Sequence, residues 1–499
     1  MRTIDPILLL ALVAPLVAAA HVPPAAGVPA SASASASASA SASAPATQHQ
    51  DALNLLAIWL DAQFAYERVP GLAAGVVVGQ QLVWSRGWGH ADHAKQVPMR
   101  PDTLGSICSI SKLFTSVAVM QLAESGKLSL DDDIGSRLPA FAMRRTDPDS
   151  GPITLRLLLT HASGLPREGA LDYWAPRDFP FPTRQALMEG LAGQSTYLRA
   201  GERYQYSNLG MALLGEVVAT VSGQPYEAYV QQHILGPLKL ADTLPNLNPA
   251  LWGSRLAQGH GSIRRDGSRE TLPLFDTRGL APAAGYSSSV EDLARFAAWQ
   301  FRLRKNGGQE VLKVATLREM QRVQWVDADG KNTWGLGFAM SREGSTTVAG
   351  HSGVCPGYVS ALALALEPEV AVIATVNAND NGGAGRFSRP MRQLMLKGLK
   401  LPLAPTAGPR LADYAGRYDA QPFGSEWIIA PWGTGLVSLA LPTDDPAAEM
   451  TVLKHVEGDT FTAVREDGGL GAEFKFQRDA AGRINGLAIW NQLYKKLQN

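Results

Sequence analysis

The 499-residue sequence is poor in cysteine and carries no excess of either charge. Two cysteines cannot build a disulfide framework or a four-cysteine zinc site. Lysine and arginine number 45, and so do aspartate and glutamate, so the sequence lacks the basic excess with which proteins bind nucleic acid. Hydrophobic residues make up 45% of the chain, which is enough for a buried core and argues against a wholly disordered protein.

Several catalytic signatures are also missing. The sequence has no Gly-x-Ser-x-Gly elbow, which argues against an α/β-hydrolase triad, and neither a His-Glu-x-x-His motif nor a P-loop. His90, Asp92 and His93 could form part of a metal site, but no further ligands follow at a useful spacing. We therefore expect no metal and no other cofactor.

Long apolar runs are confined to the N-terminus. The run from Ile7 to Ala20 is short for a bilayer span and is interrupted by Pro15. It follows Arg2 and ends in small residues, so we predict a signal peptide at 1–20, with an uncleaved anchor as the alternative. The protein should then be periplasmic or secreted, with no stable membrane span.

The rest of the sequence divides by composition. Residues 21–50 are rich in Ala, Ser and Pro and predict a disordered linker. Residues 51–400 mix helical and strand patterns, beginning with an apolar helical pattern that ends near Pro70. After a Pro-rich break at 401–410, short apolar segments separated by Gly, Pro and Asp predict a small all-β barrel or sandwich at 411–499. The expected strands are 426–430, 436–441, 451–453, 460–465, 473–477 and 484–489.

The first motif with chemical content is Ser109-Ile-Ser-Lys112, followed by an apolar helical pattern. Residues three apart on a helix share a face, so the two side chains can touch. A desolvated lysine can lose enough basicity to take the proton of a serine nucleophile. The alternative is a helix-capping serine beside a surface lysine.

Two further segments carry polar residues in turn-like contexts. In Tyr206-Ser-Asn208, a phenol could relay a proton and an amide could hold a substrate carbonyl, or the asparagine could simply cap the next helix. In His351-Ser-Gly353, the glycine permits close backbone approach beside a strand, or the segment is an ordinary strand entry with a core histidine.

These three motifs in this order resemble the serine β-lactamase and penicillin-binding-protein superfamily, most of all its class C branch. The segments at 157–166, 237–243 and 283–296 add to the resemblance, which runs from about 51 to 400. It implies an α/β (α+β) fold in which an antiparallel sheet flanked by helices packs against a helical part, with the active site between them. The C-terminal segment resembles small β-domains appended to some members.

The resemblance also implies catalytic roles. Ser109 matches the acylated nucleophile, Lys112 the lysine that helps to deprotonate it, and Tyr206 the tyrosine that shuttles protons. Loops 167–183 and 252–276 should form pocket walls, and His161 should be a structural hydrogen-bonding residue.

Substrate-binding roles follow in the same way. Asn208 matches the ligand of the substrate amide, and His351, Ser352 and Gly353 match the strand triplet that is Lys-Thr-Gly in most β-lactamases. The backbone amides of Ser109 and Val354 match the oxyanion hole. A histidine in place of the lysine is mostly uncharged at pH 7, which weakens the case for carboxylate-bearing substrates.

We therefore expect an enzyme, a hydrolase of ester or amide bonds in a small molecule or peptide, resembling esterases and D-amino-acid peptidases. The alternatives are a β-lactamase or D,D-carboxypeptidase, and a non-catalytic module that binds or senses cell-wall peptide. Because the resemblance brings the segments of Cys108 and Cys355 together, these residues form either a disulfide or two buried thiols.

Overall fold

The computed structural model describes residues 49–170, 172–379, 382–401, 409–422, 424–490 and 492–498. The predicted signal peptide, nearly all of the predicted linker and most of the 401–410 break lie outside these residues. Among the residues described, no helix is both long and apolar enough to cross a membrane.

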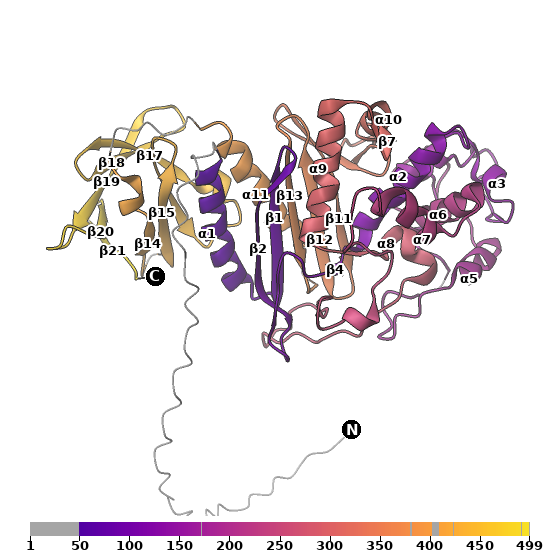
Figure 1. Ribbon diagram of the computed structural model, residues 1–499, viewed down its shortest axis with the longest axis horizontal. Coiled ribbons are helices and arrows are strands. Elements are labelled where there is room, and N and C mark those ends of the chain that lie inside the picture. The colour runs from indigo at the N-terminus through magenta and orange to yellow at the C-terminus, as the bar shows by residue number, and fades with distance from the viewer. Residues whose placement is uncertain are drawn as a thin grey trace, which may run out of the picture. The chain divides into compact units, whose positions relative to one another are not determined.

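The centre of the described chain is an antiparallel sheet of nine strands (Figure 1). Its middle strands are buried on both faces and read as almost continuous apolar sequence, as in Gly71–Val78. In spatial order the strands are β3 (Val97–Pro98), β2 (Gln81–Asp92), β1 (Gly71–Val78), β13 (Val370–Val376), β12 (Tyr358–Ala365), β11 (Thr346–Cys355), β10 (Ala339–Glu343), β9 (Thr333–Trp334) and β8 (Trp325–Val326).

The two faces of this sheet bury different cores, because successive side chains of a strand point to opposite sides. Ala73 belongs to one core together with Leu293 of α9 (Val290–Asn306). Ala74 belongs to the other, together with Leu56 of α1 (Gln50–Glu67) and Met391 of α11 (Gly385–Gly398). The sheet is therefore sandwiched between α9 and the pair α1 and α11 (Figure 1).

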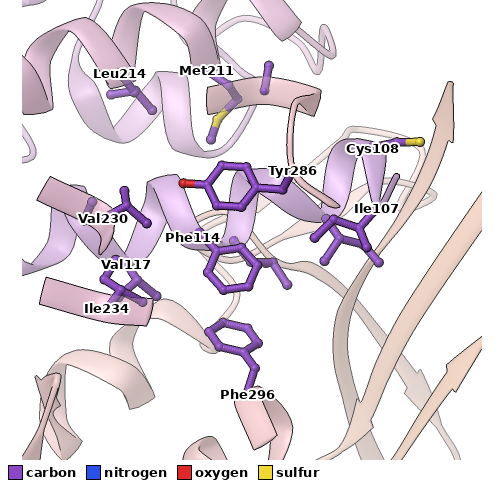
Figure 2. Close-up of a cluster of buried hydrophobic side chains, with 14 of the residues drawn as sticks. Ile107, Cys108, Phe114, Val117, Met211, Leu214, Val230, Ile234, Tyr286 and Phe296 are labelled. Atoms are coloured by element: carbon purple, nitrogen blue, oxygen red, sulfur yellow. The ribbon is translucent and has the colours of Figure 1, made fainter. Parts of the chain in front are cut away.

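A helical part adjoins the sheet on the α9 side (Figure 1). Its central helix α2 packs its Phe114 ring between the rings of Tyr286 and Phe296, at centroid distances of 5.2 and 4.6 Å (Figure 2). This packing fixes the start of α2, where the serine–lysine motif lies. The helices of this part are α2 (Ser111–Glu124), α3 (Ile134–Arg137), α4 (Leu155–Leu159), α5 (Arg184–Glu189), α6 (Asn208–Ser222), α7 (Tyr226–Val230) and α8 (Ala281–Ala284), and α10 (Val314–Met320) follows α9.

Eight strands at the C-terminus form a second antiparallel sheet in sequential order. A bridge between Tyr418 and Lys496 joins its first and last strands, so the sheet closes as a barrel. The six strands expected here are present, and two short ones, β14 and β21, complete the circle. The strands are β14 (Gly416–Asp419), β15 (Glu426–Trp432), β16 (Gly435–Leu441), β17 (Thr451–Glu457), β18 (Thr460–Val464), β19 (Leu470–Arg478), β20 (Ile484–Ile489) and β21 (Gln492–Lys495), with helix α12 (Pro446–Glu449) after β16.

The barrel packs against helix α1. Leu439 and Leu441 of β16 lie in the same apolar core as Leu56 of α1. The indole of Trp59 donates a hydrogen bond to the Thr443 carbonyl at 2.9 Å. The predicted fold class is confirmed: an antiparallel sheet flanked by helices, a helical part and a small all-β C-terminal piece.

Candidate active site

Ser109 lies in a single 3-10 turn, Cys108–Ile110, that leads directly into α2. Cys108 adopts the left-handed backbone conformation with φ 48°, which is rare outside glycine and turns the chain sharply before the serine. The hydroxyl of Ser111 donates to the Cys108 carbonyl and accepts the amide of Tyr286. These contacts hold the turn, and Ser109 is partly exposed upon it.

Lys112 is fully buried beneath Ser109. Its Nζ lies 3.0 Å from Ser109 Oγ, 2.7 Å from Asn208 Oδ1 and 2.7 Å from the Ala283 carbonyl oxygen. Burial holds the pKa of Lys112 well below its ordinary value, against the opposing charge of Glu168. A neutral amine can donate its two protons to the two carbonyl oxygens and keep its lone pair for the serine proton. The surface-lysine alternative is wrong.

The Tyr206 ring lies close to the side chains of Lys112 and Arg167. Lys112 Nζ and Arg167 Cζ are each 4.9 Å from the centroid of its ring. Burial raises the pKa of the Tyr206 hydroxyl, and the Ser109 side chain and the Arg167 charge both oppose that rise. The predicted nucleophile, base and proton shuttle therefore converge at one point.

Asn208 is the first residue of α6, but it does not cap the helix. The cap is Ser207, whose hydroxyl accepts the amide of Gly210 at 2.8 Å. The Asn208 side chain instead accepts from Lys112 and donates to Glu168 Oε1 at 2.6 Å. The capping alternative is wrong, because the preceding serine takes that role.

The His351-Ser-Gly motif lies on β11, where one edge of the strand is uncovered. Strand β10 pairs with β11 only as far as Gly350, whereas β12 pairs with β11 as far as its last residue, Cys355. A Cβ on Gly353 would lie 2.3 Å from the Ile107 carbonyl oxygen and 2.9 Å from Cys108 Cβ. Only glycine lets the strand approach the serine turn this closely. Ser352 is exposed and Val354 is 60% exposed.

The His351 imidazole is buried rather than open to solvent. Its Nδ1 donates to the Ser352 carbonyl at 2.6 Å, and its ring centroid lies 5.5 Å from that of Trp334 and 6.3 Å from that of Tyr206. Burial and the nearby Lys112 lower its pKa to about 3. At neutral pH this position carries no positive charge.

Cys108 and Cys355 form a disulfide with Cα atoms 5.7 Å apart. The sequence left open a disulfide or two buried thiols, and the structure contains the disulfide. The bridge connects the residue before Ser109 to the residue after Val354, and so links the two segments whose amides match an oxyanion hole.

Ser109, Asn208 and Val354 open into a cavity of about 840 Å³. Its walls come from the two loops expected to form them. Trp174 and Phe179 give one loop an aromatic surface. The other loop contributes residues 272–273 and Glu270, which pairs with Arg177 of the first loop at 2.6 Å. The cavity therefore combines apolar walls with charged groups at its rim.

Three residues of the site were not singled out from the sequence, although two of them lie in the loop 167–183 that was predicted to form a pocket wall. Arg167 and Glu168 line the cavity from a loop, and Trp334 comes from a two-residue strand. A further hint was the pair of opposite charges directly after the segment at 157–166. His161 does make a structural hydrogen bond, since its Nδ1 accepts the amide of Ser207 at 3.2 Å.

The candidate metal half-site is not completed. The rings of His90 and His93 lie 5.1 Å apart in an edge-to-face contact. Within the described residues, no group of three or more His, Cys, Asp or Glu side chains could hold a metal ion.

Comparison with known proteins places this site in a family. The model of the family described as Beta-lactamase matches residues 59–397, well over half of the chain. The chain belongs to the beta-lactamase family. The match covers the sheet, the helical part and all three motifs.

Two curated proteins are similar to this chain over a large part of its length. Beta-lactamase-like protein 2 of Dictyostelium discoideum is 28% identical over 301 residues, covering 59% of this chain and 54% of that protein. The D-alanyl-D-alanine-carboxypeptidase/endopeptidase AmpH of Escherichia coli K12 is 26% identical over 338 residues, covering 66% of this chain and 85% of that protein. The chain thus spans about half the length of the Dictyostelium relative.

A solved structure shares the fold over most of the chain. The octameric penicillin-binding protein homologue from Pyrococcus abyssi has a TM-score of 0.59 and 22% identity, covering 89% of this chain and all of that one. That coverage confirms the serine β-lactamase and penicillin-binding-protein fold seen from the sequence.

Proposed function

We propose that this protein is an exported serine hydrolase that forms an acyl-enzyme on Ser109 and cleaves ester or amide bonds. The observation that carries the proposal is the buried Lys112 amine 3.0 Å from Ser109 Oγ. A serine is a weak nucleophile until a neighbouring base takes its proton, and burial supplies the low basicity that this lysine needs.

In the proposed reaction, Lys112 Nζ accepts the proton of Ser109 as Oγ attacks the substrate carbonyl. The amides of Ser109 and Val354 stabilise the oxyanion. Tyr206 donates its hydroxyl proton to the leaving group as the bond to the carbonyl carbon breaks, and the proton that Lys112 took from Ser109 restores the Tyr206 hydroxyl. Water then attacks the acyl-enzyme, and its proton returns through the same groups, so that Ser109 is regenerated.

The substrate class follows from the charges at the site. The uncharged His351 offers no fixed cation where most β-lactamases have lysine, so esters, and amides without a carboxylate on that side, are favoured. Asn208 donates one of its two N–H protons to Glu168 and accepts Lys112 on one of its two lone pairs, so the same amide can also bind a substrate amide.

The second candidate is a D,D-carboxypeptidase or β-lactamase. It is favoured by the similarity to AmpH across 85% of that protein. The third candidate is a non-catalytic module that binds cell-wall peptide. Such a module would become acylated on Ser109 but would not turn the substrate over.

Turnover of three substrates tests the proposal: a short-chain p-nitrophenyl ester, a chromogenic cephalosporin and a D-alanyl peptide. We expect the ester to be cleaved fastest and Ser109→Ala to abolish the activity. Faster cleavage of the cephalosporin or peptide would support the second candidate. Activity that survives Ser109→Ala would contradict the mechanism.

A further inference from the structure

Two adjacent residues of opposite charge, Arg167 and Glu168, lie beside the groups that would move protons in this site. The Arg167 carbonyl accepts the amides of Asn208 and Leu209 at 2.8 and 3.2 Å. This backbone contact ties the loop to the first turn of α6. The backbone at Arg167 is therefore held beside the residue that contacts Lys112.

Glu168 reaches Lys112 through one intervening side chain. Its Oε1 accepts a hydrogen bond from Asn208 Nδ2 at 2.6 Å. Asn208 Oδ1 in turn accepts a hydrogen bond from Lys112 Nζ at 2.7 Å. Its Oε2 accepts the hydroxyl of Tyr173 at 2.6 Å. Because both carboxylate oxygens are engaged, the anion is held close to the lysine and also orients the asparagine amide.

Arg167 acts from the other side of the same groups. Its guanidinium stacks over the Tyr206 ring at 4.9 Å, and Lys112 Nζ is the same distance from that ring. Its side chain is 61% exposed, and its ion pair with Glu168, through Nε, is 3.3 Å long. It therefore places a permanent cation beside Tyr206.

The other titratable groups facing Lys112 and Tyr206 are uncharged near neutral pH. Burial lowers the pKa of His161 well below its ordinary value and that of His351 to about 3. Burial raises the pKa of Tyr204 to about 12. Within the described site, the fixed charges that act on Lys112 and Tyr206 are those of the two loop residues.

We infer that Arg167 and Glu168 are positioning residues that act with opposite sign on the proton transfers of Ser109, Lys112 and Tyr206. The inference rests on the proposed function, since it assumes acylation of Ser109. It assigns to this loop dipeptide the control of the pH at which the site becomes reactive.

The direction of each effect follows from electrostatics. A nearby cation disfavours protonated Lys112 and favours ionised Tyr206, so Arg167 lowers the pKa of both groups. The Glu168 anion raises the pKa of both. Reactivity that requires either group without its proton appears as pH rises. Loss of Arg167 should therefore move its onset to higher pH, and loss of Glu168 should move it to lower pH.

The experiment measures the rate at which a fluorophosphonate labels Ser109 as a function of pH, in the full-length protein. Arg167→Gln should shift the midpoint upward by about half a pH unit or more, and Glu168→Gln should shift it downward by a similar amount. Below the midpoint, each shift corresponds to a rate change of about threefold. Arg167→Lys and Glu168→Asp keep the charges and should largely restore the wild-type midpoint.

Arg177→Gln is the matched control, because Arg177 lines the same cavity but is paired with Glu270. It should leave the midpoint in place. A purely structural role of the dipeptide would lower the rate at every pH without moving the midpoint. If the labelling midpoints of the two glutamine variants stay fixed, or move in the same direction, the inference is overturned while the proposed function still stands. If Ser109 is not labelled at any pH, the proposed function fails and the inference falls with it.

Discussion

At the scale of single residues, burial decides the chemistry of the site. Lys112 is fully enclosed, and this burial disfavours its ammonium form. Two carbonyl oxygens bind its N–H groups, which leaves the lone pair of the neutral amine free to face Ser109. His351 is enclosed as well, and its pKa of about 3 removes the cation that a lysine would supply. Burial therefore makes Lys112 suitable as a base and leaves His351 without a charge.

Replacement of Lys112 by arginine separates basicity from charge. Arginine stays protonated at all accessible pH values and cannot accept the serine proton. We expect Lys112→Arg to lower the rate of ester hydrolysis by about 10²–10⁴-fold, as far as Lys112→Met does. Steady-state kinetics with a p-nitrophenyl ester measures this, and near wild-type activity in the arginine variant would exclude Lys112 as the base.

A lysine at position 351 should change substrate preference. His351→Lys introduces a cation where the native side chain is neutral, so hydrolysis of carboxylate-bearing substrates should rise relative to neutral esters. The ratio of kcat/KM for a matched pair of substrates, one with and one without a carboxylate, gives the answer. His351→Gln is the neutral control and should keep the wild-type ratio. An unchanged ratio in the lysine variant would count against the interpretation of this position.

At the scale of elements, the site forms where the starts of α2 and α6 meet the end of β11. The motifs on these elements were predictable, because each combines a short polar signature with a regular apolar pattern beside it. The loop of Arg167 and Glu168 was predicted to line the pocket, but the contacts of these two residues and of Trp334 were not, because a loop and a two-residue strand carry no periodicity and such contacts depend on tertiary packing. The disulfide connects the turn that leads into α2 to the last residue of β11.

The disulfide should stabilise the protein, since it closes a loop of 247 residues in the unfolded chain. We expect the unreduced, denatured protein to show no free thiols by titration at Cys108 and Cys355. The double variant Cys108→Ala/Cys355→Ala should lose about 2–5 kcal/mol of unfolding free energy.

A reducing agent distinguishes the stabilisation by the disulfide from other effects of the two substitutions. It should lower the Tm of the wild type and leave the double variant unchanged. Two titratable thiols in the unreduced wild type would refute the bridge.

At the scale of the whole molecule, the barrel is part of the structural core rather than a detached appendage. Strands β15 and β16 bury one face inside the barrel, at Ile429 and Leu436, and the other against α1, at Ile428 and Leu439. Strand alternation made an all-β segment predictable. The closure of this segment into a barrel was not predictable, because the closing strands β14 and β21 are four residues each and mix polar with apolar side chains.

A charge placed between the barrel and α1 tests this packing. Leu439 is 1% exposed, so Leu439→Asp buries an unpaired carboxylate and should cost about 3–5 kcal/mol of unfolding free energy. Leu470→Asp is the control, because Leu470 is 61% exposed on β19 and the change should stay within about 0.5 kcal/mol. Chemical denaturation measures both values. Similar stabilities of the two variants would show that the barrel does not depend on α1.

The most direct test of the account is to trap its acyl-enzyme. The protein is mixed with an ester substrate, quenched in acid during turnover, and mapped by mass spectrometry of its peptides. The account predicts one added acyl group, on Ser109, that accumulates before the steady state and is absent from Ser109→Ala. An acyl group on another residue, or turnover with no acylated Ser109 at any time, would contradict it.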